Sequence, residues 1–307
     1  MAKNNEKNQK KVGIIVVTFN RKKLLKECLQ ALLKQSYKNY EILLIDNAST
    51  DGTHEYIEDL IDGEKLQYFN TGKNLGGAGG FNYGVREAMK KNYDYAWLMD
   101  DDSIADDKDA LKILVEKAAY LKDDFSFLAG VVKWTDGNLC MMNIPKLDEK
   151  GWHDKVSLYK EGLVPIESST FVSFFANMKI VKKAGLPIKE FFIYGDDWEY
   201  SLRMRQFAQP YMVTDSVITH KMGVNVNASI VDCPAERIGR CYYDYRNQAY
   251  VIRNFGAKKD KIKRKYLYFA FVWNILRRAK DKRLKRIHTL NKGYIAGMFF
   301  RPKIEKK

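Results

Sequence analysis

The sequence has few cysteines and no long apolar run, and each shortage excludes a class of protein. The four cysteines are scattered and include no CxxC pair, which fits a reducing compartment and argues against a disulfide framework or a zinc site. No apolar signal core follows the lysine-rich residues 1–11, so we expect a disordered tail and no secretion signal. No stretch reaches the roughly 18 apolar residues that a membrane-spanning helix needs. We therefore expect a cytoplasmic protein.

The chain also lacks an even distribution of charge. Residues 256–307 hold 18 of the 53 lysines and arginines but only 3 of the 38 acidic residues, whereas the other 255 positions carry 35 of each. The formal net charge of +15 therefore comes entirely from the last sixth of the chain. This asymmetry indicates a neutral body with a basic extension that faces an anionic partner.

Four apolar runs alternate with helical patterns over the first hundred residues. The runs are 12–19, 40–46, 66–70 and 95–100, and they are rich in β-branched and aromatic residues. This β-α-β-α-β-α-β order predicts an α/β fold with a mostly parallel sheet and helices on both of its faces.

Polar or glycine residues follow the carboxyl end of each of these runs. In open sheets of this kind, ligands bind beyond the carboxyl ends of the strands. The residues at these ends are Thr18, Phe19 and Asn20, then Asp46, then the stretch that begins at Asn74, and last Asp100, Asp101 and Asp102. We expect them to meet at one edge of the sheet, around a ligand. Asn20 is also expected to cap the helix that follows it.

The three consecutive aspartates at 100–102 repel one another, so the fold gains nothing from the arrangement by itself. Hard divalent cations take oxygen ligands, and Mg²⁺ sites combine one or two carboxylates with phosphate oxygens of a substrate. We interpret Asp100 and Asp102 as an Asp-x-Asp pair that holds Mg²⁺ or Mn²⁺ on a diphosphate. A solvated acidic loop or a helix cap is the alternative, because Asp-x-Asp alone is common.

The stretch NLGGAGGF, residues 74–81, places four glycines ahead of a helical pattern. At Gly76, Gly77, Gly79 and Gly80 the backbone could approach a ligand closely, and the N–H groups of the helix favour phosphate. The spacing is not GxGxxG and no Walker lysine follows, so a flexible turn with close helix packing is the alternative.

A second acidic centre, Asp196 and Asp197, lies later in the chain within YGDDWEY. A carboxylate pair in an apolar, aromatic setting can contain one group suited to general base catalysis, and a helix N-cap is the alternative. His220 ends a later apolar run and is a candidate third metal ligand, with a structural histidine as the alternative.

Together and in this order, the motifs resemble those of inverting GT-A glycosyltransferases of family two. VVTFNR and LLIDNASTDGT resemble the nucleoside-binding segments, LMDDD the metal motif and GDDWEY the acidic motif on the acceptor side. The resemblance implies that Asp46 contacts the nucleotide base and that Asp197 is the catalytic base, beside Asp196. It also implies a Rossmann-like GT-A catalytic domain at 12–225, with a nucleotide-sugar half at 12–105 and an acceptor half at 106–225, followed by a basic helical region at 226–307.

Within the family, NLGGAGGF and the triple aspartate are similar to bacterial galactofuranosyltransferases, with rhamnosyltransferases of cell-surface polysaccharide synthesis close behind. YYDYRN, residues 242–247, resembles both groups, and the galactofuranosyl group has a metal-site histidine at the position of His220. The resemblance implies a single displacement from UDP-galactofuranose or dTDP-rhamnose to a hydroxyl of a glycan or lipid-linked saccharide. Asp101 would contact the sugar nucleotide. Tyr194 and Trp198 would stack on the acceptor sugar, with packing as the alternative for both.

The basic tail contains the apolar segment YLYFAFVWNIL, residues 266–276, between clusters of lysine and arginine. Such a helix suits an anionic membrane surface, so we expect peripheral attachment at the inner face of the cell membrane. Nucleic acid is the rival partner, but the neutral body and the acidic strand ends argue against it. A solvated helix or a contact between subunits is a third use of the tail.

Two other functions compete with the transferase interpretation. A catalytically silent sugar-nucleotide-binding protein would keep the fold without the chemistry, and the intact Asp100, Asp102 and Asp197 count against it. A basic nucleic-acid-binding protein would bind DNA or RNA without needing the acidic site. Residues 136–168 match no pattern and are expected to shape the acceptor site.

Overall fold

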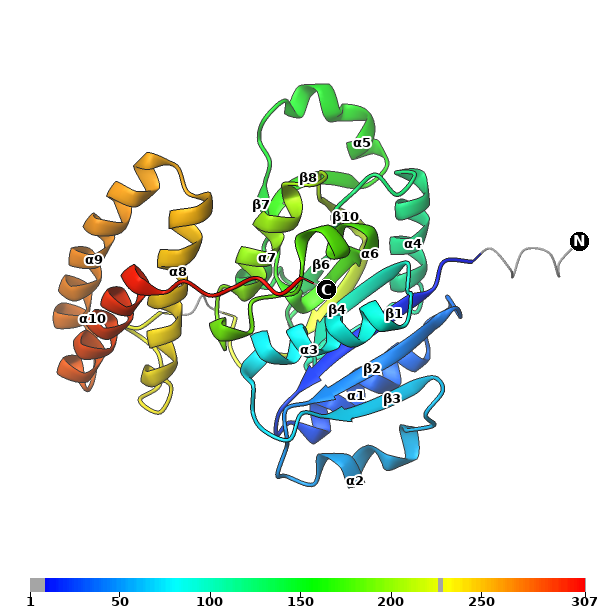
Figure 1. The fold of residues 1–307 in the computed structure, drawn as a ribbon, viewed down its shortest axis with the longest axis horizontal. Coiled ribbons are helices and arrows are strands. Elements are labelled where there is room, and N and C mark those ends of the chain that lie inside the picture. The colour runs from blue at the N-terminus through cyan, green and yellow to red at the C-terminus, as the bar shows by residue number, and fades with distance from the viewer. Residues whose placement is uncertain (1–8, 226–228, 307) are drawn as a thin grey trace, which may run out of the picture.

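The computed structural model describes residues 9–225 and 229–306 (Figure 1). Within these residues, one ten-stranded sheet carries helices on both faces, and a bundle of three long helices lies at one end. The predicted α/β architecture is therefore confirmed. The expected disordered tail falls mainly on residues 1–8, and the expected domain boundary falls at 226, so both lie outside the described residues.

The first half of the sheet consists of four neighbouring strands. They are β1 (Val12–Thr18), β2 (Tyr40–Asp46), β3 (Leu66–Asn70) and β4 (Tyr95–Asp100), in the spatial order β3-β2-β1-β4. All three pairings between them are parallel, as the alternation of elements predicts. The helices of this half are α1 (Lys22–Leu33), α2 (Thr53–Ile57) and α3 (Gly76–Lys90).

Strand β1 is buried along all seven of its residues, because helices cover both faces of the sheet there. Ile14 and Val16 belong to the core that includes Leu25 and the rest of the apolar stripe of α1. Ile15 belongs to the core on the opposite face, with Val85 of α3. A continuous apolar run therefore folds as a central strand, since both alternating sets of side chains leave water.

The second half of the sheet mixes strand directions. Its strands are β5 (Ser103–Ile104), β6 (Phe127–Lys133), β7 (Lys146–Leu147), β8 (Leu163–Ser168), β9 (Phe174–Asn177) and β10 (Tyr211–His220). β9 inserts antiparallel between β4 and β6, and β10 runs parallel to β6 but antiparallel to β8 and β5. The parallel arrangement thus holds for the first four strands, and the sheet as a whole is mixed. The helices here are α4 (Ala110–Tyr120), α5 (Val156–Lys160), α6 (Met178–Ala184) and α7 (Asp196–Arg205).

Three helices form the basic bundle at the carboxyl end of the chain. They are α8 (Cys241–Phe255), α9 (Lys258–Arg278) and α10 (Arg283–Phe299). The bundle has its own small core, which includes Tyr245, Ile275 and Leu290. α8 lies on the side of the sheet domain and α9 on the outer side (Figure 1). No helix among the described residues is both long and apolar enough to span a membrane.

Two connections fix this bundle to the sheet domain. Tyr250 and Val251 of α8 share a core with Ala78 and Phe191. Beyond α10, the chain runs back over the sheet domain (Figure 1), where the Leu186 N–H donates to the Glu305 carbonyl at 2.9 Å. The Glu305 carboxylate also pairs with Lys189 at 2.5 Å. The basic region is therefore attached to the sheet domain at α8 and again at the end of the chain.

Candidate functional site

The carboxyl ends of β1, β2 and β4 lie level with one another. Thr18 is in register with Asp46, and Val17 is in register with Asp100. The hydroxyl of Thr18 donates to Asp101 Oδ2 at 2.7 Å, and both side chains are buried. Residues from three separate strand ends thus meet at one sheet edge.

The loop after β1 is tied to the loop after β2. The Asn20 N–H donates to Ser49 Oγ at 2.9 Å, and Asn20 Oδ1 accepts from the Thr50 N–H at 2.7 Å. The expectation that Asn20 caps the next helix is wrong, because α1 begins at Lys22 without a side-chain cap and the Asn20 amide is used by this loop contact. Phe19 is 38% exposed beside it. Both residues are open to a ligand at this edge.

Asp46 is buried, and the protein already engages both of its carboxylate oxygens. Oδ1 accepts from the Ser49 N–H at 2.8 Å, and Oδ2 accepts from the Tyr68 hydroxyl at 2.5 Å. These bonds hold the side chain in one orientation at the end of β2. Because each carboxylate oxygen has a second lone pair, a contact with a nucleotide base is still available to it and stays a prediction.

Three of the four glycines in 76–80 are required by packing. A Cβ on Gly76 would lie 2.1 Å from the Phe192 carbonyl oxygen, and the φ of Gly76 is +71°. Cβ atoms on Gly79 and Gly80 would each lie 2.5 Å from an aliphatic side-chain carbon. The packing alternative therefore accounts for these three positions.

Gly77 differs from its neighbours, because nothing lies within 4 Å of where its Cβ would be. It sits in the first turn of α3, where the Ala78 N–H donates to the Phe192 carbonyl at 3.2 Å, and the Gly77 N–H makes no hydrogen bond among the described residues and is open to an anion. Asn74 Oδ1 accepts from the Gly76 N–H at 2.8 Å and so holds the start of this helix. The expected close approach of a ligand is thus concentrated at Gly77.

Asp100, Asp102 and His220 form a cluster with the composition of a metal site. One ligand atom from each of the three side chains lies within 4.8 Å of the other two. His220 reaches the cluster because β10 pairs with β5, which places His220 opposite Ser103. Its Nε2 lies 3.0 Å from Asp102 Oδ1. Two carboxylates and one imidazole suit Mn²⁺ and are compatible with Mg²⁺.

Asn143 orients His220 from the other side of the ring. Its Oδ1 lies 2.8 Å from His220 Nδ1, and its own amide donates to Thr170 Oγ at 2.7 Å. With Nδ1–H donating to Asn143, Nε2 is the nitrogen turned toward the carboxylates, which is the arrangement of a metal-binding histidine. The pKa of His220 is raised by Asp102 and Asp100 against the opposing effect of burial. The pocket therefore stabilises positive charge at this position.

Arg21 also supplies positive charge at the strand ends. Its guanidinium lies 3.3 Å from Asp101 Oδ1 and also hydrogen-bonds Asp102. Burial would raise the pKa of Asp102, but the hydrogen bond and charge of His220 and the charge of Arg21 lower it. Burial raises the pKa of Asp100 to about 6 and that of Asp101 to about 7. A set of partly uncompensated carboxylates of this kind fits a divalent cation.

The second acidic pair stands at the start of α7. Gly195 precedes the helix with a φ of +78°, and Asp197 Oδ1 accepts from the Trp198 N–H at 2.7 Å. Burial and, to a smaller extent, the charge on Asp100 raise the pKa of Asp197 to about 6, although the Trp198 N–H lowers it. Asp196 has a pKa well above its usual value, because of burial and the charges of Asp197 and Asp100. The two acidic motifs therefore lie within electrostatic reach of each other.

Tyr194 and Trp198, which are expected to stack on the acceptor sugar, flank this pair in the sequence. Both are half-buried, and Trp198 packs partly against the core that contains Phe191 and Tyr250. Packing therefore accounts for part of the Trp198 surface, and stacking on a sugar stays a prediction for both residues.

Sequence reasoning missed three residues that the structure places around the site. Arg21 ends the motif VVTFNR, directly after Asn20. Its position at the end of the first strand, the same sheet edge as the triple aspartate, was the available signal. Asn247 lies in YYDYRN, which the resemblance marked without giving it a role. Asn143 lies in the segment 136–168, where no pattern indicated a role.

Comparisons with known proteins agree with this geometry. Over 94% of the chain, the structure is similar to S. aureus TarS 1–349 in complex with UDP-GlcNAc, with a TM-score of 0.52, 15% identity and 92% of that chain covered. Over 95%, it is similar to the mannosyltransferase PcManGT from Pyrobaculum calidifontis in complex with GDP-Man and Mn²⁺, with a TM-score of 0.57, 17% identity and 76% of that chain covered. The fold is that of the GT-A glycosyltransferases.

Comparison of the sequence with known families identifies the family of the chain. The model of glycosyl transferase family 2 matches residues 13–178, more than half of the chain, and the chain belongs to that family. The galactofuranosyltransferase GlfT1 of Mycobacterium tuberculosis (strain ATCC 25618 / H37Rv) is 26% identical over 284 residues, which cover 87% of this chain and 90% of that protein. The protein is thus a family 2 glycosyltransferase with a candidate Asp-x-Asp metal site.

Proposed function

We propose that this glycosyltransferase moves galactofuranose, with rhamnose as the second choice, from a nucleoside-diphosphate donor to a hydroxyl of a growing, lipid-linked cell-surface glycan. One chain of contacts carries the proposal: Asn47, after β2, donates to the Gly76 carbonyl at 3.0 Å, and the Ala78 N–H donates at 3.2 Å to the Phe192 carbonyl, in the loop before Asp197. The charge on Asp100, in the candidate metal site, also raises the pKa of Asp197. A cation site and a candidate base thus adjoin one region. The 26% identity to GlfT1 over most of both chains favours galactofuranose.

On the donor side, the chain offers a site for the diphosphate. The carboxylates of Asp100 and Asp102 and the Nε2 of His220 are the groups that would hold Mn²⁺ or Mg²⁺. When bound, such an ion neutralises charge that develops on a leaving diphosphate. Arg21 adds a fixed positive charge beside the same carboxylates, and the open space at Gly77 leaves its own backbone N–H, at the start of α3, accessible. The Mn²⁺ and sugar nucleotides named for PcManGT and TarS support this assignment.

On the acceptor side, Asp197 takes the proton of the attacking hydroxyl. With a pKa near 6 it is mostly ionised at neutral pH yet basic enough to accept a proton. Burial and the charge of Asp197 raise the pKa of the neighbouring Asp196 well above its usual value, so the pair resists carrying two negative charges. A single base opposite the leaving group implies one displacement with inversion at the anomeric carbon.

The partners follow from this chemistry. They are UDP-galactofuranose or dTDP-rhamnose as donor, a glycan or lipid-linked saccharide as acceptor, and an anionic membrane surface at its cytoplasmic face that the basic helices meet. We do not propose nucleic acid as a partner, because residues 1–255, which hold the acidic site, carry 35 basic and 35 acidic residues and have no net positive charge.

A donor screen tests the proposal. The purified full chain would be assayed with UDP-galactofuranose, dTDP-rhamnose and UDP-hexopyranoses on a lipid-linked acceptor, with Mn²⁺ and with EDTA. We expect turnover with UDP-galactofuranose that EDTA abolishes. Equal turnover of every donor, or activity untouched by EDTA, would contradict the proposal. Donor binding without turnover would instead favour a catalytically silent sugar-nucleotide-binding protein.

A further inference from the structure

Helix α9 has two apolar faces, and the bundle covers only one of them. On the inner face, the Tyr268 hydroxyl donates to Asn291 Oδ1 at 2.8 Å, the Phe271 ring lies 5.5 Å from that of Tyr245, and Ile275 is fully buried. This face alone accounts for the packing of α9 on α8 and α10. It leaves the opposite face without a neighbour among the described residues.

The outer face of α9 carries a second stripe of large apolar side chains. The stripe consists of Ile262, Tyr266, Phe269, Trp273 and Leu276, which are 47% to 72% exposed. Their spacing of four and three residues puts them on one side of the helix, centred about 150° from the inner face at about 100° per residue. An exposed patch of five large apolar side chains marks an interaction surface.

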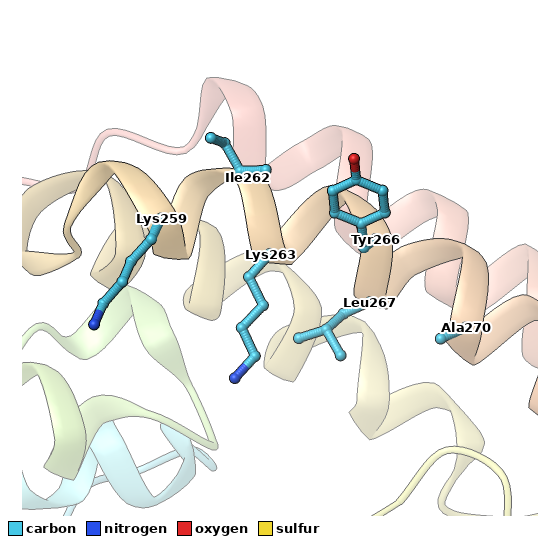
Figure 2. Close-up of a pocket in the computed structure, with 6 residues that line it drawn as sticks. All are labelled: Lys259, Ile262, Lys263, Tyr266, Leu267 and Ala270. Atoms are coloured by element: carbon cyan, nitrogen blue, oxygen red, sulfur yellow. The ribbon is translucent and has the colours of Figure 1, made fainter.

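Basic side chains border this stripe on both sides. Lys259 and Lys263 lie along one border, and Lys261 and Lys265 lie along the other, and all four are exposed. In Figure 2, Ile262 and Tyr266 project to one side of α9, and Lys259 and Lys263 project to the other. Asp260 is the single acidic residue of α9, and its carboxylate is engaged by the Ala257 N–H at 2.7 Å. The face is therefore apolar at its centre and cationic at its edges.

We propose that the outer face of α9 lies in the interface of an anionic lipid bilayer, with the helix axis parallel to the membrane plane. The aromatic stripe would enter the headgroup boundary, and the bordering lysines would contact lipid phosphates. A second copy of the chain fits less well, because pairing two such faces would bring their lysines together. The choice of a lipid surface also rests on the proposed lipid-linked acceptor.

Vesicle co-sedimentation of the full chain tests this proposal. Vesicles of pure phosphatidylcholine would be compared with vesicles in which about a third of the lipid is phosphatidylglycerol. We expect binding to the anionic vesicles and a loss of at least tenfold in partitioning for the triple variant Tyr266→Ser/Phe269→Ser/Trp273→Ser. Tyr120→Ser, which removes an aromatic ring that is 50% exposed on α4, is the matched control and should bind as the wild type does.

Two further measurements distinguish membrane binding from loss of the proposed transferase activity and from self-association. Donor hydrolysis in vesicle-free buffer reports the proposed function independently, and we expect the triple variant to retain it. Light scattering reports self-association at micromolar concentration. Wild-type protein that ignores anionic vesicles, or a triple variant that binds them equally well, overturns the proposal. A wild-type dimer that the triple variant breaks assigns the face to a second copy instead.

A second, independent observation concerns the loop before Asp196 and Asp197. Phe192 and Tyr194 have φ values of +64° and +65°, in the left-handed region that aromatic residues rarely adopt. Such backbone persists only where its surroundings hold it. Any relaxation of this loop would move the start of α7, where both aspartates stand.

Two residues of α8 hold this loop in place. Asn247 is fully buried, and its Nδ2 lies 2.8–3.1 Å from the carbonyl oxygens of Phe191, Ile193 and Tyr194. Arg246 Nε donates to Asn247 Oδ1 at 2.9 Å, and its Nη2 donates to the Glu190 carbonyl at 2.5 Å. Side chains of the basic bundle thus bind four carbonyls of the loop.

We infer that Arg246 and Asn247 are positioning residues for the acidic pair. They touch neither the metal cluster nor the ends of β1, β2 and β4 in any contact that the described residues make. Their loss should therefore affect the transfer step and spare donor binding. The inference rests on the proposed role of Asp197 as the base.

Steady-state kinetics of Asn247→Ala test this inference. We expect kcat for transfer to fall at least tenfold, with the donor KM and the Mn²⁺ affinity within twofold of wild type. Asn254→Ala is the matched control, because Asn254 is exposed on the same helix and its amide donates to the Tyr250 carbonyl of that helix. Arg246→Lys keeps the charge and serves if Asn247→Ala does not fold.

The possible results are distinct. An unchanged kcat, or a loss of donor and metal affinity as large as the loss of kcat, overturns the positioning role. If Asp197→Asn leaves kcat unchanged as well, the proposed base itself is wrong. If Asp197→Asn lowers kcat and Asn247→Ala does not, only the positioning inference fails.

Discussion

His220 Nε2 lies 3.0 Å from Asp102 Oδ1, although 118 positions separate the two residues in the chain. The contact joins the end of β10 to the turn after β4, so the half of the sheet that contains β1 to β4 and the half that contains β10 share one candidate site. It also explains how a histidine on a late strand supplements two carboxylates from an early one. The predictions below follow from this geometry.

Replacing Asn143 should weaken metal binding without removing any ligand. Its amide oxygen is the partner of His220 Nδ1, and loss of such an orienting hydrogen bond typically costs about 10–100-fold in metal affinity. We expect this loss for Asn143→Ala in a calorimetric Mn²⁺ titration. Asn138→Ala is the control, because Asn138 is exposed in the same segment and its side-chain amide donates to Asp136. Equal affinity of Asn143→Ala and wild type would contradict the account of His220.

Two adjacent glycines should respond differently to substitution. Gly76→Ala forces a Cβ against the Phe192 carbonyl at a positive φ, so we expect the free energy of unfolding to fall by about 2–4 kcal/mol. Gly77→Ala meets open space, and its effect on stability should stay within about 0.5 kcal/mol. Because its Cβ would face the proposed diphosphate, we expect the donor KM to rise about tenfold. Urea unfolding and donor kinetics measure the two effects, and a destabilised Gly77→Ala or a tolerated Gly76→Ala would refute the assignment.

Activity should decline as the pH falls below about 6. The pKa of Asp197 is raised to about 6, and only its deprotonated form can accept the hydroxyl proton. The rate should therefore be nearly independent of pH just above 7 and should drop about tenfold per pH unit well below 6. A cation bound beside Asp100 offsets the charge that raises this pKa, so saturating Mn²⁺ should move the midpoint lower. A pH profile of kcat at saturating Mn²⁺ tests the decline. A carboxyl NMR titration of Asp197 with and without diamagnetic Mg²⁺ tests the effect of the cation, and a pKa of Asp197 that the cation leaves unmoved would contradict the coupling between the two acidic motifs.

The fold was predictable where the sequence pattern is local. The apolar runs that form β1, β2, β3 and β4 carry their own strand signal, and their alternation with helices gives the parallel order. The strand ends then follow, so Thr18, Asp46 and the aspartates at 100–102 could be placed at one edge in advance. The insertion of β9 between β4 and β6 could not, because the apolar residues of Phe174–Asn177 indicate burial but not which strands they pair with.

The site was predictable only for residues whose chemistry is visible without their neighbours. Adjacent carboxylates at a strand end suggest a cation, but the role of Asn143 depends on which ring nitrogen of His220 it faces. In the same way, Gly76 and Gly77 are adjacent residues of the same type. Only their surroundings in the fold distinguish the packing role of Gly76 from the proposed binding role of Gly77. Asn247 acts through carbonyl groups of a loop more than fifty positions away, and such partners leave no trace in a sequence pattern.

The proposed transfer reaction depends most on Asp197, as the base that activates the acceptor. The direct measurement is acceptor-dependent turnover of Asp197→Asn, with Mn²⁺ and saturating donor, alongside donor affinity from equilibrium binding. Asp215→Asn, on the exposed part of β10, is the control. We predict that Asp197→Asn lowers kcat by about 10²–10⁴-fold and binds donor as wild type does. Turnover within a fewfold of wild type would contradict the account.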